Sequence, residues 1–279
     1  MKDKICVITG ATSGIGYATA MSLAGKGATL GLVSRNKNKG ETTIKAIREK
    51  TQNKNIELFV ADLSSQAEIR RLASEIILKY PHIDVLINNA GAINPDKIET
   101  VDGIETTFAV NHLAYFLLTN LLLDKLKAAP KARIVNVASQ ASMMGKINFD
   151  DLNYRKSYSA MKTYSQSKLA NIMFTYELDK RLKGTNVVVN CLHPGVIRTN
   201  FGKGLKGFTG AVFQNLGGLM RTAEKGAETV LWLASSKEAE NVSGKYFKDN
   251  AEIKSNKLSY DSEVQKKLWE VSEQLTNKK

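Results

Sequence analysis

Short apolar runs alternate along almost the whole chain with amphipathic stretches in which apolar residues recur at the helical period. The apolar runs are rich in Val, Ile and Leu and show little polar alternation, which is typical of strands buried on both faces of a parallel sheet. This order predicts an α/β fold: a single doubly wound domain with a central parallel sheet of about seven strands. The predicted strands are Ile5–Thr9, Thr29–Ser34, Ile56–Val60, Val85–Asn88, Ile134–Val137 and Val187–Leu192, with a seventh near Gly244–Phe247.

The amphipathic stretches between these strands predict helices on both faces of the sheet. Residues 199–221 follow neither pattern, since they combine many glycines with large apolar side chains. This composition favours a substrate lid over an apolar pocket; the alternatives are a surface loop and a short amphipathic helix at a membrane. The predicted helices are Gly14–Lys26, Lys39–Thr51, Gln66–Tyr80, Val101–Ala128, Tyr158–Lys183, Thr222–Ala234 and Ser262–Thr276.

A glycine-rich turn follows the first strand directly and opens the first helix. Glycine allows a tight turn and lets a diphosphate approach bare backbone, while the free N–H groups of the helix N-terminus attract negative charge. The turn therefore predicts a Rossmann-type dinucleotide site, although its glycine spacing differs from the common G-x-G-x-x-G. The residues expected to bind the cofactor here are Gly10, Thr12, Ser13, Gly14, Ile15 and Gly16.

The end of the second strand indicates which dinucleotide fits. NAD-specific sites place a carboxylate there for the ribose 2′-hydroxyl, but this chain reads Ser34-Arg35-Asn36 and has no acid before Glu41. A serine hydroxyl and a guanidinium are suitable partners for a 2′-phosphate. We therefore predict that NADP(H) is preferred over NAD(H), the alternative being that Arg35 is an ordinary surface arginine.

Asp62 and Leu63 close the third predicted strand. The Asp62 carboxylate can accept a hydrogen bond from the adenine amino group. It can equally cap the helix that begins near Ser64. Both residues are expected to border the cofactor.

Tyr164 and Lys168 stand at positions i and i+4 of a predicted helix and so share one face. Tyrosine titrates near pH 10, but a neighbouring ammonium and a positively charged nicotinamide both favour the phenolate. Tyr164 can then act as general acid or base. Ser139 follows the strand Ile134–Val137, and its hydroxyl can hydrogen-bond the substrate oxygen.

A second pair with the same spacing, Tyr158 and Lys162, precedes this one. Six residues of helix turn Tyr158 by about 240° from Tyr164, so only one pair can face the cofactor. Small residues follow Tyr164 and allow its helix to pack close to a ligand. We therefore assign the chemistry to Tyr164.

Asn111 lies in an otherwise apolar helical stretch, and a buried amide needs partners. It is either a satisfied core residue or the holder of a water that links Lys168 to solvent. A residue next to it on a helix points about 100° away, so His112 is interpreted as a packing residue. His193, before Pro194, is interpreted in the same way.

The composition of the 279 residues narrows the possible partners and location. The sequence has two cysteines, Cys6 and Cys191, and both lie in apolar runs, so we expect neither a disulfide framework nor a metal site. This use of cysteine favours a reducing, cytoplasmic location. The net charge of +13 is spread over helices and loops, and this distribution argues against nucleic-acid binding. The positive charge is compatible with an anionic cofactor or, at most, with peripheral membrane contact. No leader segment is expected before the first strand, and no apolar run long enough to span a bilayer.

With these residues assembled, the chain resembles the short-chain dehydrogenase/reductase family over nearly its whole length. The matching motifs are Thr9–Gly16, Asn88–Gly91, Asn111, Val135–Ser139, Tyr164 with Lys168, and Pro194-Gly195.

The resemblance implies a catalytic tetrad of Asn111, Ser139, Tyr164 and Lys168. It makes Tyr164 the acid/base, Ser139 the substrate-positioning donor, Lys168 the ribose ligand that lowers the tyrosine pKa, and Asn111 the holder of a relay water. It also implies further cofactor contacts from Asn89, Ala90, Gly91, Pro194, Gly195, Val196 and Thr199.

Within the family the chain is similar to the retinol-dehydrogenase-like branch, although Ala138 replaces a frequent serine and no counterpart of the N-terminal anchor of animal members is expected. The resemblance predicts an NADP(H)-dependent oxidoreductase that interconverts an alcohol and a carbonyl on an apolar or lipid-like substrate. A homo-oligomer is also expected, because two long predicted helices offer a face for it. The alternative is a catalytically weak NADP(H)-sensing protein on the same fold. The stretches that carry the similarity are Tyr164–Ile172, His193–Thr199, Val242–Phe247 and Leu268–Ser272.

Overall fold

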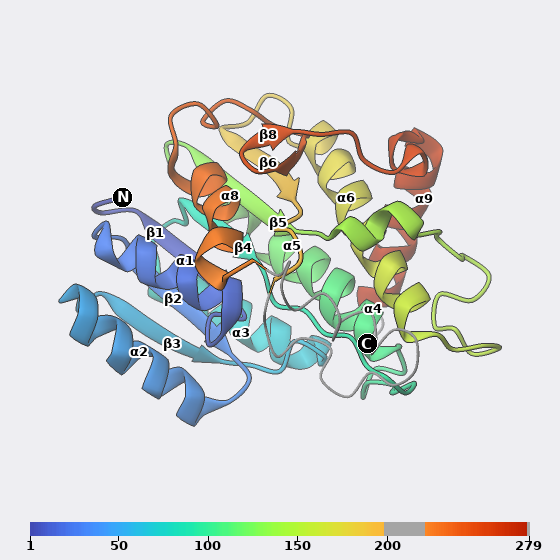
Figure 1. Ribbon diagram of the computed structural model, residues 1–279, viewed down its shortest axis with the longest axis horizontal. Helices are drawn as coiled ribbons and strands as arrows, with labels where there is room; N and C mark the ends of the chain where they lie inside the picture. The colour runs from blue at the N-terminus through green and yellow to red at the C-terminus, as the bar shows by residue number, and fades with distance from the viewer. Residues whose placement is uncertain (198–220, 278–279) are drawn as a thin grey trace.

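One central sheet organises the computed structural model, which describes residues 1–197 and 221–277. Its strand order is β3-β2-β1-β4-β5-β6-β7-β8, and within the described residues every pairing is parallel except that of β7 with β8 (Figure 1). The chain order reverses direction between β1 and β4, which opens a crevice at the carboxyl ends of the strands. The strands are β1 (Ile5–Thr9), β2 (Thr29–Ser34), β3 (Ile56–Val60), β4 (Val85–Asn88), β5 (Ala132–Val137), β6 (Val187–Leu192), β7 (Tyr246–Lys248) and β8 (Ala251–Glu252).

The doubly wound α/β prediction is confirmed, and two details of the sheet differ from it. β5 begins at Ala132, two residues before its apolar run. An eighth strand follows β7 through Asp249 and Asn250, which both adopt positive φ (51° and 62°) and turn the chain back antiparallel. Positive φ at two successive residues is the geometry of a tight hairpin turn. β8 has two exposed residues and therefore no apolar run to reveal it.

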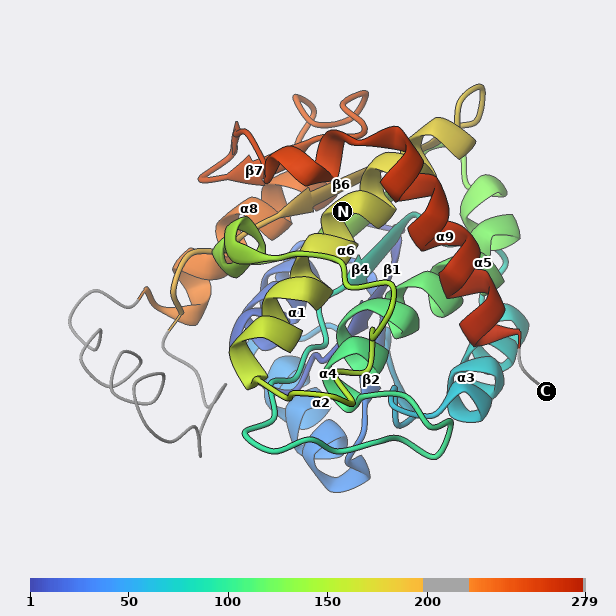
Figure 2. The same ribbon diagram turned by 90° about the vertical axis from the view of Figure 1, so that its right-hand side faces the viewer.

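Helices cover both faces of the sheet (Figures 1 and 2). On one face lie α1 (Gly14–Gly25), α2 (Lys37–Thr51) and α8 (Ala223–Ser235), which share one core with the sheet. The other face carries α3 (Gln66–Lys79), α5 (Ala114–Lys127) and α6 (Ala160–Arg181), whose apolar side chains form a second core. The predicted substrate lid, residues 199–221, lies outside the described residues except for Arg221.

Two predicted helix starts were too early. The helix expected from Val101 begins with α4 (Thr106–Phe108), because Glu105 caps it by accepting hydrogen bonds from the Thr107 and Phe108 amides. A π-helical turn, η1 (Ala109–Leu113), then leads into α5. The helix expected from Tyr158 begins at Ala160, capped by Ser159, so Tyr158 lies outside it.

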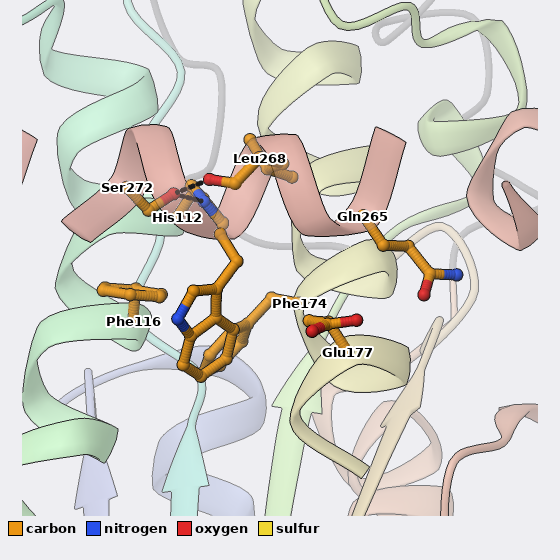
Figure 3. Close-up of a pocket in the computed structure, with 8 residues that line it drawn as sticks. His112, Phe116, Phe174, Glu177, Gln265, Leu268 and Ser272 are labelled. Atoms are coloured by element: carbon orange, nitrogen blue, oxygen red, sulfur yellow. Dashed lines mark hydrogen bonds between the residues drawn. The ribbon is translucent and has the colours of Figure 1, made fainter. Parts of the chain in front are cut away.

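The C-terminal helix α9 (Ser262–Thr276) packs across the outer side of α5 and α6 (Figure 2). Trp269 stacks on Phe174, with ring centroids 5.8 Å apart, and meets the edge of Phe116 at 4.8 Å. The Arg181 guanidinium lies 4.1 Å from the centre of the Trp269 ring. Figure 3 shows Phe116 and Phe174 beneath α9. The Trp269 side chain thus covers part of the outer side of α5 and α6, and the homo-oligomer stays a prediction.

One helical segment of the described chain, Thr106–Lys127, is long and apolar enough to cross a bilayer. The expectation that no stretch reaches this length is therefore wrong. Of its most apolar window, 72% is buried, because α5 packs against the sheet. The position of this segment in the core accounts for its apolar composition.

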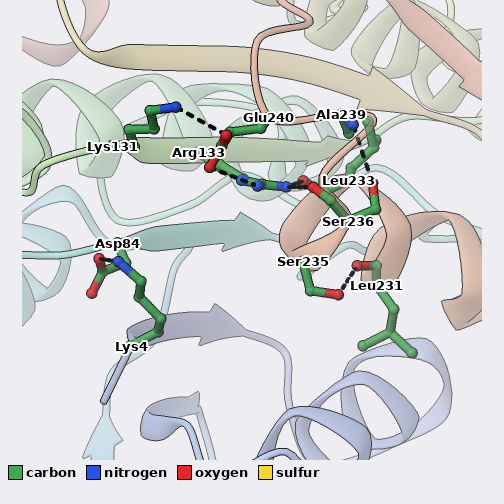
Figure 4. A network of polar contacts seen from close by, with 10 residues as sticks. All are labelled: Lys4, Asp84, Lys131, Arg133, Leu231, Leu233, Ser235, Ser236, Ala239 and Glu240. Carbon is green, nitrogen blue, oxygen red and sulfur yellow. Dashed lines mark hydrogen bonds and ion pairs between the residues drawn. The ribbon is translucent and has the colours of Figure 1, made fainter. Parts of the chain in front are cut away.

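A polar network ties the amino ends of the strands to α8 (Figure 4). The Arg133 guanidinium, on β5, donates to the Leu233 and Ser236 carbonyls at 3.0 and 2.8 Å and so caps the last turn of α8. Lys4, just before β1, pairs with the buried Asp84 at 2.8 Å. These groups lie at the edge of the sheet opposite the crevice and stabilise the fold.

Candidate active site

The crevice at the carboxyl ends of the strands is a cavity of about 750 Å³. Most of the predicted site residues, from all the separated motifs, line it together. Those lining residues are Gly10, Thr12, Ser13, Gly14, Ile15, Ser34, Arg35, Asp62, Leu63, Asn89, Ala90, Gly91, Ser139, Tyr164, Lys168, Pro194, Gly195 and Val196.

Three predicted residues do not line the cavity. Gly16 is buried in the first turn of α1, and Asn111 is fully buried. Asn36 is the N-cap of α2, where its side chain accepts a hydrogen bond from the Lys39 amide at 2.9 Å. Thr199 lies outside the described residues.

The glycine turn is held tightly against the segment after β4. The Asn89 amide group donates to the carbonyls of Thr9 and Gly10 at 2.9 and 3.2 Å. The Thr9 hydroxyl in turn accepts from the backbone amides of Asn89 and Ala90 at 2.9 and 3.0 Å. A Cβ on Gly16 would lie 2.3 Å from the Gly10 carbonyl oxygen. Glycine is required because the two segments leave no room for a methyl group.

The first turn of α1 can receive an anion. Ser13 caps the helix without a side-chain hydrogen bond, and the first turn has no acidic residue. The backbone N–H groups of this first turn therefore remain available to a ligand at the cavity wall, where the helix dipole favours a phosphate. The residues present fit the diphosphate of a dinucleotide.

The end of β2 brings Ser34 and Arg35 to the cavity. Ser34 is buried, and its hydroxyl bridges the backbone of Asn36, donating to the carbonyl at 3.0 Å. Arg35 is exposed and is among the residues that line the cavity. Asp62 lines the neighbouring wall and accepts from the Ser64 amide at 2.9 Å; the cap of α3 is Ser65. Helix capping by Asp62 is therefore wrong, and its hydrogen bond from the adenine amino group stays a prediction.

At the other end of the cavity, α6 and β5 bring together the proton-transfer candidates. Burial raises the pKa of Tyr164 to about 12, and a hydrogen bond with the Ser139 side chain opposes that rise. Lys168 donates to the Val137 carbonyl at 2.8 Å, and its Nζ lies 5.9 Å from the centre of the Tyr164 ring. Burial lowers the pKa of Lys168 to about 7. The phenol, the hydroxyl and the amine thus share one wall.

The competing tyrosine faces elsewhere. Tyr158 does not line the cavity, and its hydroxyl donates to the Asn94 carbonyl at 2.7 Å. Burial raises its pKa to about 12, as it does for Tyr164, so the two phenols differ in position and not in pKa. The geometry therefore favours Tyr164.

Asn111 lies in the π-helical turn η1, a kind of turn frequent at functional sites. Its side chain donates to the Ala92 carbonyl and the Ser167 hydroxyl, both at 2.9 Å, and accepts from the Ala92 amide at 2.7 Å. Ser167 donates onward to the Tyr164 carbonyl at 2.8 Å. The Asn111 side chain thus ties the segment after β4 to the helix that carries Tyr164.

Both candidate histidines have packing contacts. His112 Nε2 meets the Ser272 hydroxyl of α9 at 3.0 Å, and burial lowers its pKa to about 4 (Figure 3). His193 accepts from the Gly195 amide at 3.0 Å, and burial likewise lowers its pKa to about 4.

Sequence reasoning missed the apolar end of the cavity. Met161 lies one helical turn before Tyr164 and so shares its face, a spacing that could have revealed it. The other side chains carry no motif, because an apolar residue beside a pocket resembles a core residue in the sequence. The missed lining residues include the apolar Val110, Ala141, Met144, Met161 and Ile197 and the polar Asn94 and Thr106.

Comparison with known proteins agrees with this geometry. The family model described as short chain dehydrogenase matches residues 4–207. Human retinol dehydrogenase 13 is 43% identical over 98% of this chain and 84% of its own length.

Two solved structures are similar to the whole fold. A crystal structure of an uncharacterized protein from Mycobacterium paratuberculosis has a TM-score of 0.81 and 34% identity, covering 100% of this chain and 95% of that one. A short chain dehydrogenase from Escherichia coli CFT073, complexed with NADPH, has a TM-score of 0.70 and 26% identity, covering 88% and 96%. The chain therefore belongs to the short-chain dehydrogenase family, whose fold binds a nicotinamide cofactor, and it is similar to the retinol dehydrogenases.

Proposed function

We propose that this chain is an NADP(H)-dependent oxidoreductase that interconverts an alcohol and a carbonyl on an apolar, lipid-like substrate. The observation that carries the proposal is one cavity with an anion-binding glycine turn at one end and Tyr164, Ser139 and Lys168 at the other. A bound nicotinamide supplies or accepts the hydride. The protein must then move one proton.

Tyr164 is placed to move that proton. In reduction its phenol donates the proton to the carbonyl oxygen as the carbonyl carbon gains the hydride, and in oxidation the phenolate takes the proton back. Ser139 can donate a hydrogen bond to the same substrate oxygen. Burial opposes the phenolate, but the Lys168 ammonium on the same helix favours it.

The preference for NADP(H) rests on the end of β2. The segment from Ser34 to Lys39 contains no carboxylate, whereas Arg35 places a guanidinium at the cavity. A carboxylate there would repel a 2′-phosphate, and a guanidinium can pair with it. The NADPH complex of the similar Escherichia coli protein supports this assignment.

Arg35→Ala should therefore weaken NADPH binding and leave NADH binding nearly unchanged. A charge-assisted contact is worth about 1.5–3 kcal/mol, or roughly a ten- to hundredfold loss of affinity. Isothermal titration of both cofactors measures the effect, with Lys50→Ala, an exposed cation of α2 away from the cavity, as the control. Equal losses for NADPH and NADH would mean that Arg35 does not contact the 2′-position.

The apolar substrate class rests on the side chains beyond Tyr164. Val110, Met144 and Met161 line that end, and a retinol dehydrogenase is among the similar proteins. Flexible methionines accommodate apolar ligands of varied shape.

Steady-state oxidation of NADPH with a series of straight-chain aldehydes tests the function. Each buried methylene contributes about 0.8 kcal/mol, so kcat/KM should rise by up to roughly fourfold per carbon until the cavity is filled. Hydroxylated aldehydes of matched length are the controls. Preference for the hydroxylated series would contradict an apolar substrate.

We also propose a cytoplasmic location. Cys6 and Cys191 are both free and buried, and burial raises the pKa of each thiol to about 12, so they remain protonated and inert. Such thiols suit a reducing compartment.

A further inference from the structure

Lys168 has little in its surroundings to hold its charge. It is 3% exposed, and the Val137 carbonyl accepts its hydrogen bond at 2.8 Å. Among the described residues it forms no ion pair, and burial alone accounts for the lowering of its pKa to about 7. Two aromatic rings also lie near Nζ, those of Tyr164 on α6 and Tyr115 on α5.

Tyr115 is the closer of these rings. Its centre lies 5.6 Å from Lys168 Nζ, within the range at which the face of an aromatic ring attracts a cation. Tyr115 is itself 1% exposed and stands one turn beyond Asn111. It does not line the cavity, so it cannot touch the cofactor or the substrate directly.

The hydroxyl of Tyr115 makes a second connection. It donates to the Ala90 carbonyl at 2.8 Å. Ala90 lies on the cavity wall beside Asn89, which holds the glycine turn. Burial raises the pKa of Tyr115 well above its ordinary value, so the phenol remains a neutral donor at working pH.

We propose that Tyr115 is a positioning residue for Lys168: its ring holds the buried ammonium from the side of α5, while its hydroxyl anchors that ring to the segment beside the glycine turn. The side chain thereby fixes both the place and the charge of the lysine that acts on Tyr164. The inference rests on the proposed function only for the role of Lys168, because the contact itself stands on geometry.

The titration of Lys168 tests the contact without any substrate. Protein labelled with ¹³C at lysine is titrated by NMR, and the Lys168 resonance is assigned by its absence in Lys168→Met. Tyr115→Phe keeps the ring without the hydroxyl and provides the reference value of the Lys168 pKa. A trifluorinated phenylalanine at position 115 has nearly the same shape but a depleted ring face, so it should lower the Lys168 pKa by about 0.4–1.5 pH units relative to Phe. Tyr115→Leu, which removes the ring, should lower it at least as far.

Tyr80 offers a matched control. It is also buried, and its hydroxyl also donates to a backbone carbonyl, that of Leu30 at 3.3 Å, but it lies on the β2 side of the sheet, away from Lys168. Tyr80→Leu should therefore leave the Lys168 pKa unchanged. The proposal is overturned if the trifluorinated and Phe variants titrate alike, or if Tyr80→Leu shifts Lys168 as much as Tyr115→Leu does.

Activity gives the second readout. If the protonated lysine is needed, the high-pH limb of the kcat/KM profile should move to lower pH in the trifluorinated variant by the same amount as the NMR pKa, with Tyr115→Phe as reference. An NMR shift with no turnover in any variant would support the contact and count against the proposed enzyme. If the high-pH limb of the kcat/KM profile moved while the Lys168 pKa measured by NMR did not, the role assigned to Tyr115 would be overturned.

Discussion

Tyr164→Phe should reduce kcat by about 10²–10⁴-fold, the range that a positioned general acid or base contributes. The variant removes the titrating oxygen and its hydrogen bond with Ser139, while the ring still fills the wall of the cavity. The affinity for NADPH should therefore be nearly unchanged. Steady-state turnover and cofactor titration on the same preparation measure the two effects.

Tyr158→Phe is the matched control for this result. It removes an equally partnered phenol, whose hydroxyl donates to the Asn94 carbonyl, from a position outside the cavity. The lost hydrogen bond should cost about 1 kcal/mol of stability and little activity. If Tyr158→Phe abolished turnover and Tyr164→Phe did not, the wrong tyrosine would have been chosen.

Gly16→Ala should lower the affinity for NADPH by roughly five- to 150-fold. Its Cβ would lie 2.3 Å from the Gly10 carbonyl oxygen and 2.5 Å from Asn89 Nδ2, so α1 must move away from the glycine turn. Overpacking of this kind costs about 1–3 kcal/mol. The movement displaces the free N–H groups that would receive the diphosphate. Isothermal titration with NADPH measures the loss.

Gly25→Ala provides the control in the same helix. The nearest atom to its added Cβ is the Thr51 methyl group, at 3.9 Å, which is an ordinary contact. Cofactor affinity should be unchanged, and the helix should be slightly more stable because alanine loses less conformational freedom than glycine. Equal losses of NADPH affinity in the two variants would contradict the idea that Gly16 is needed for the close packing of α1 against the glycine turn.

The alternation of apolar and amphipathic segments predicted the sheet because each parallel strand is buried on both faces. β1, β2, β3, β4 and β6 have the bounds that their apolar runs predict. β8 could not be found, since two exposed residues carry no such pattern. The start of α4 was missed for a different reason: Glu105 caps the helix with its carboxylate, yet in the sequence a glutamate reads equally well as part of a helix.

The polar end of the site was predictable because glycine, serine, tyrosine and lysine seldom occur together at these spacings unless they share a chemical task. The apolar end was not, since Val110 and Met161 cannot be told from core residues until the fold places them beside Tyr164. The role of Tyr115 could not be predicted from the sequence for the same reason. Its partners, Lys168 and Ala90, are distant in the sequence and meet only in the packed fold.

Transfer of deuterium from NADPH labelled at the reactive nicotinamide carbon to an apolar aldehyde tests the central claim most directly. The product alcohol is recovered and its label is located by mass spectrometry and NMR, with Tyr164→Phe as the inactive control. We predict one deuterium on the former carbonyl carbon and none in the control. Tight NADPH binding without labelled product from any aldehyde or ketone would contradict the account and indicate a cofactor-sensing protein on the same fold.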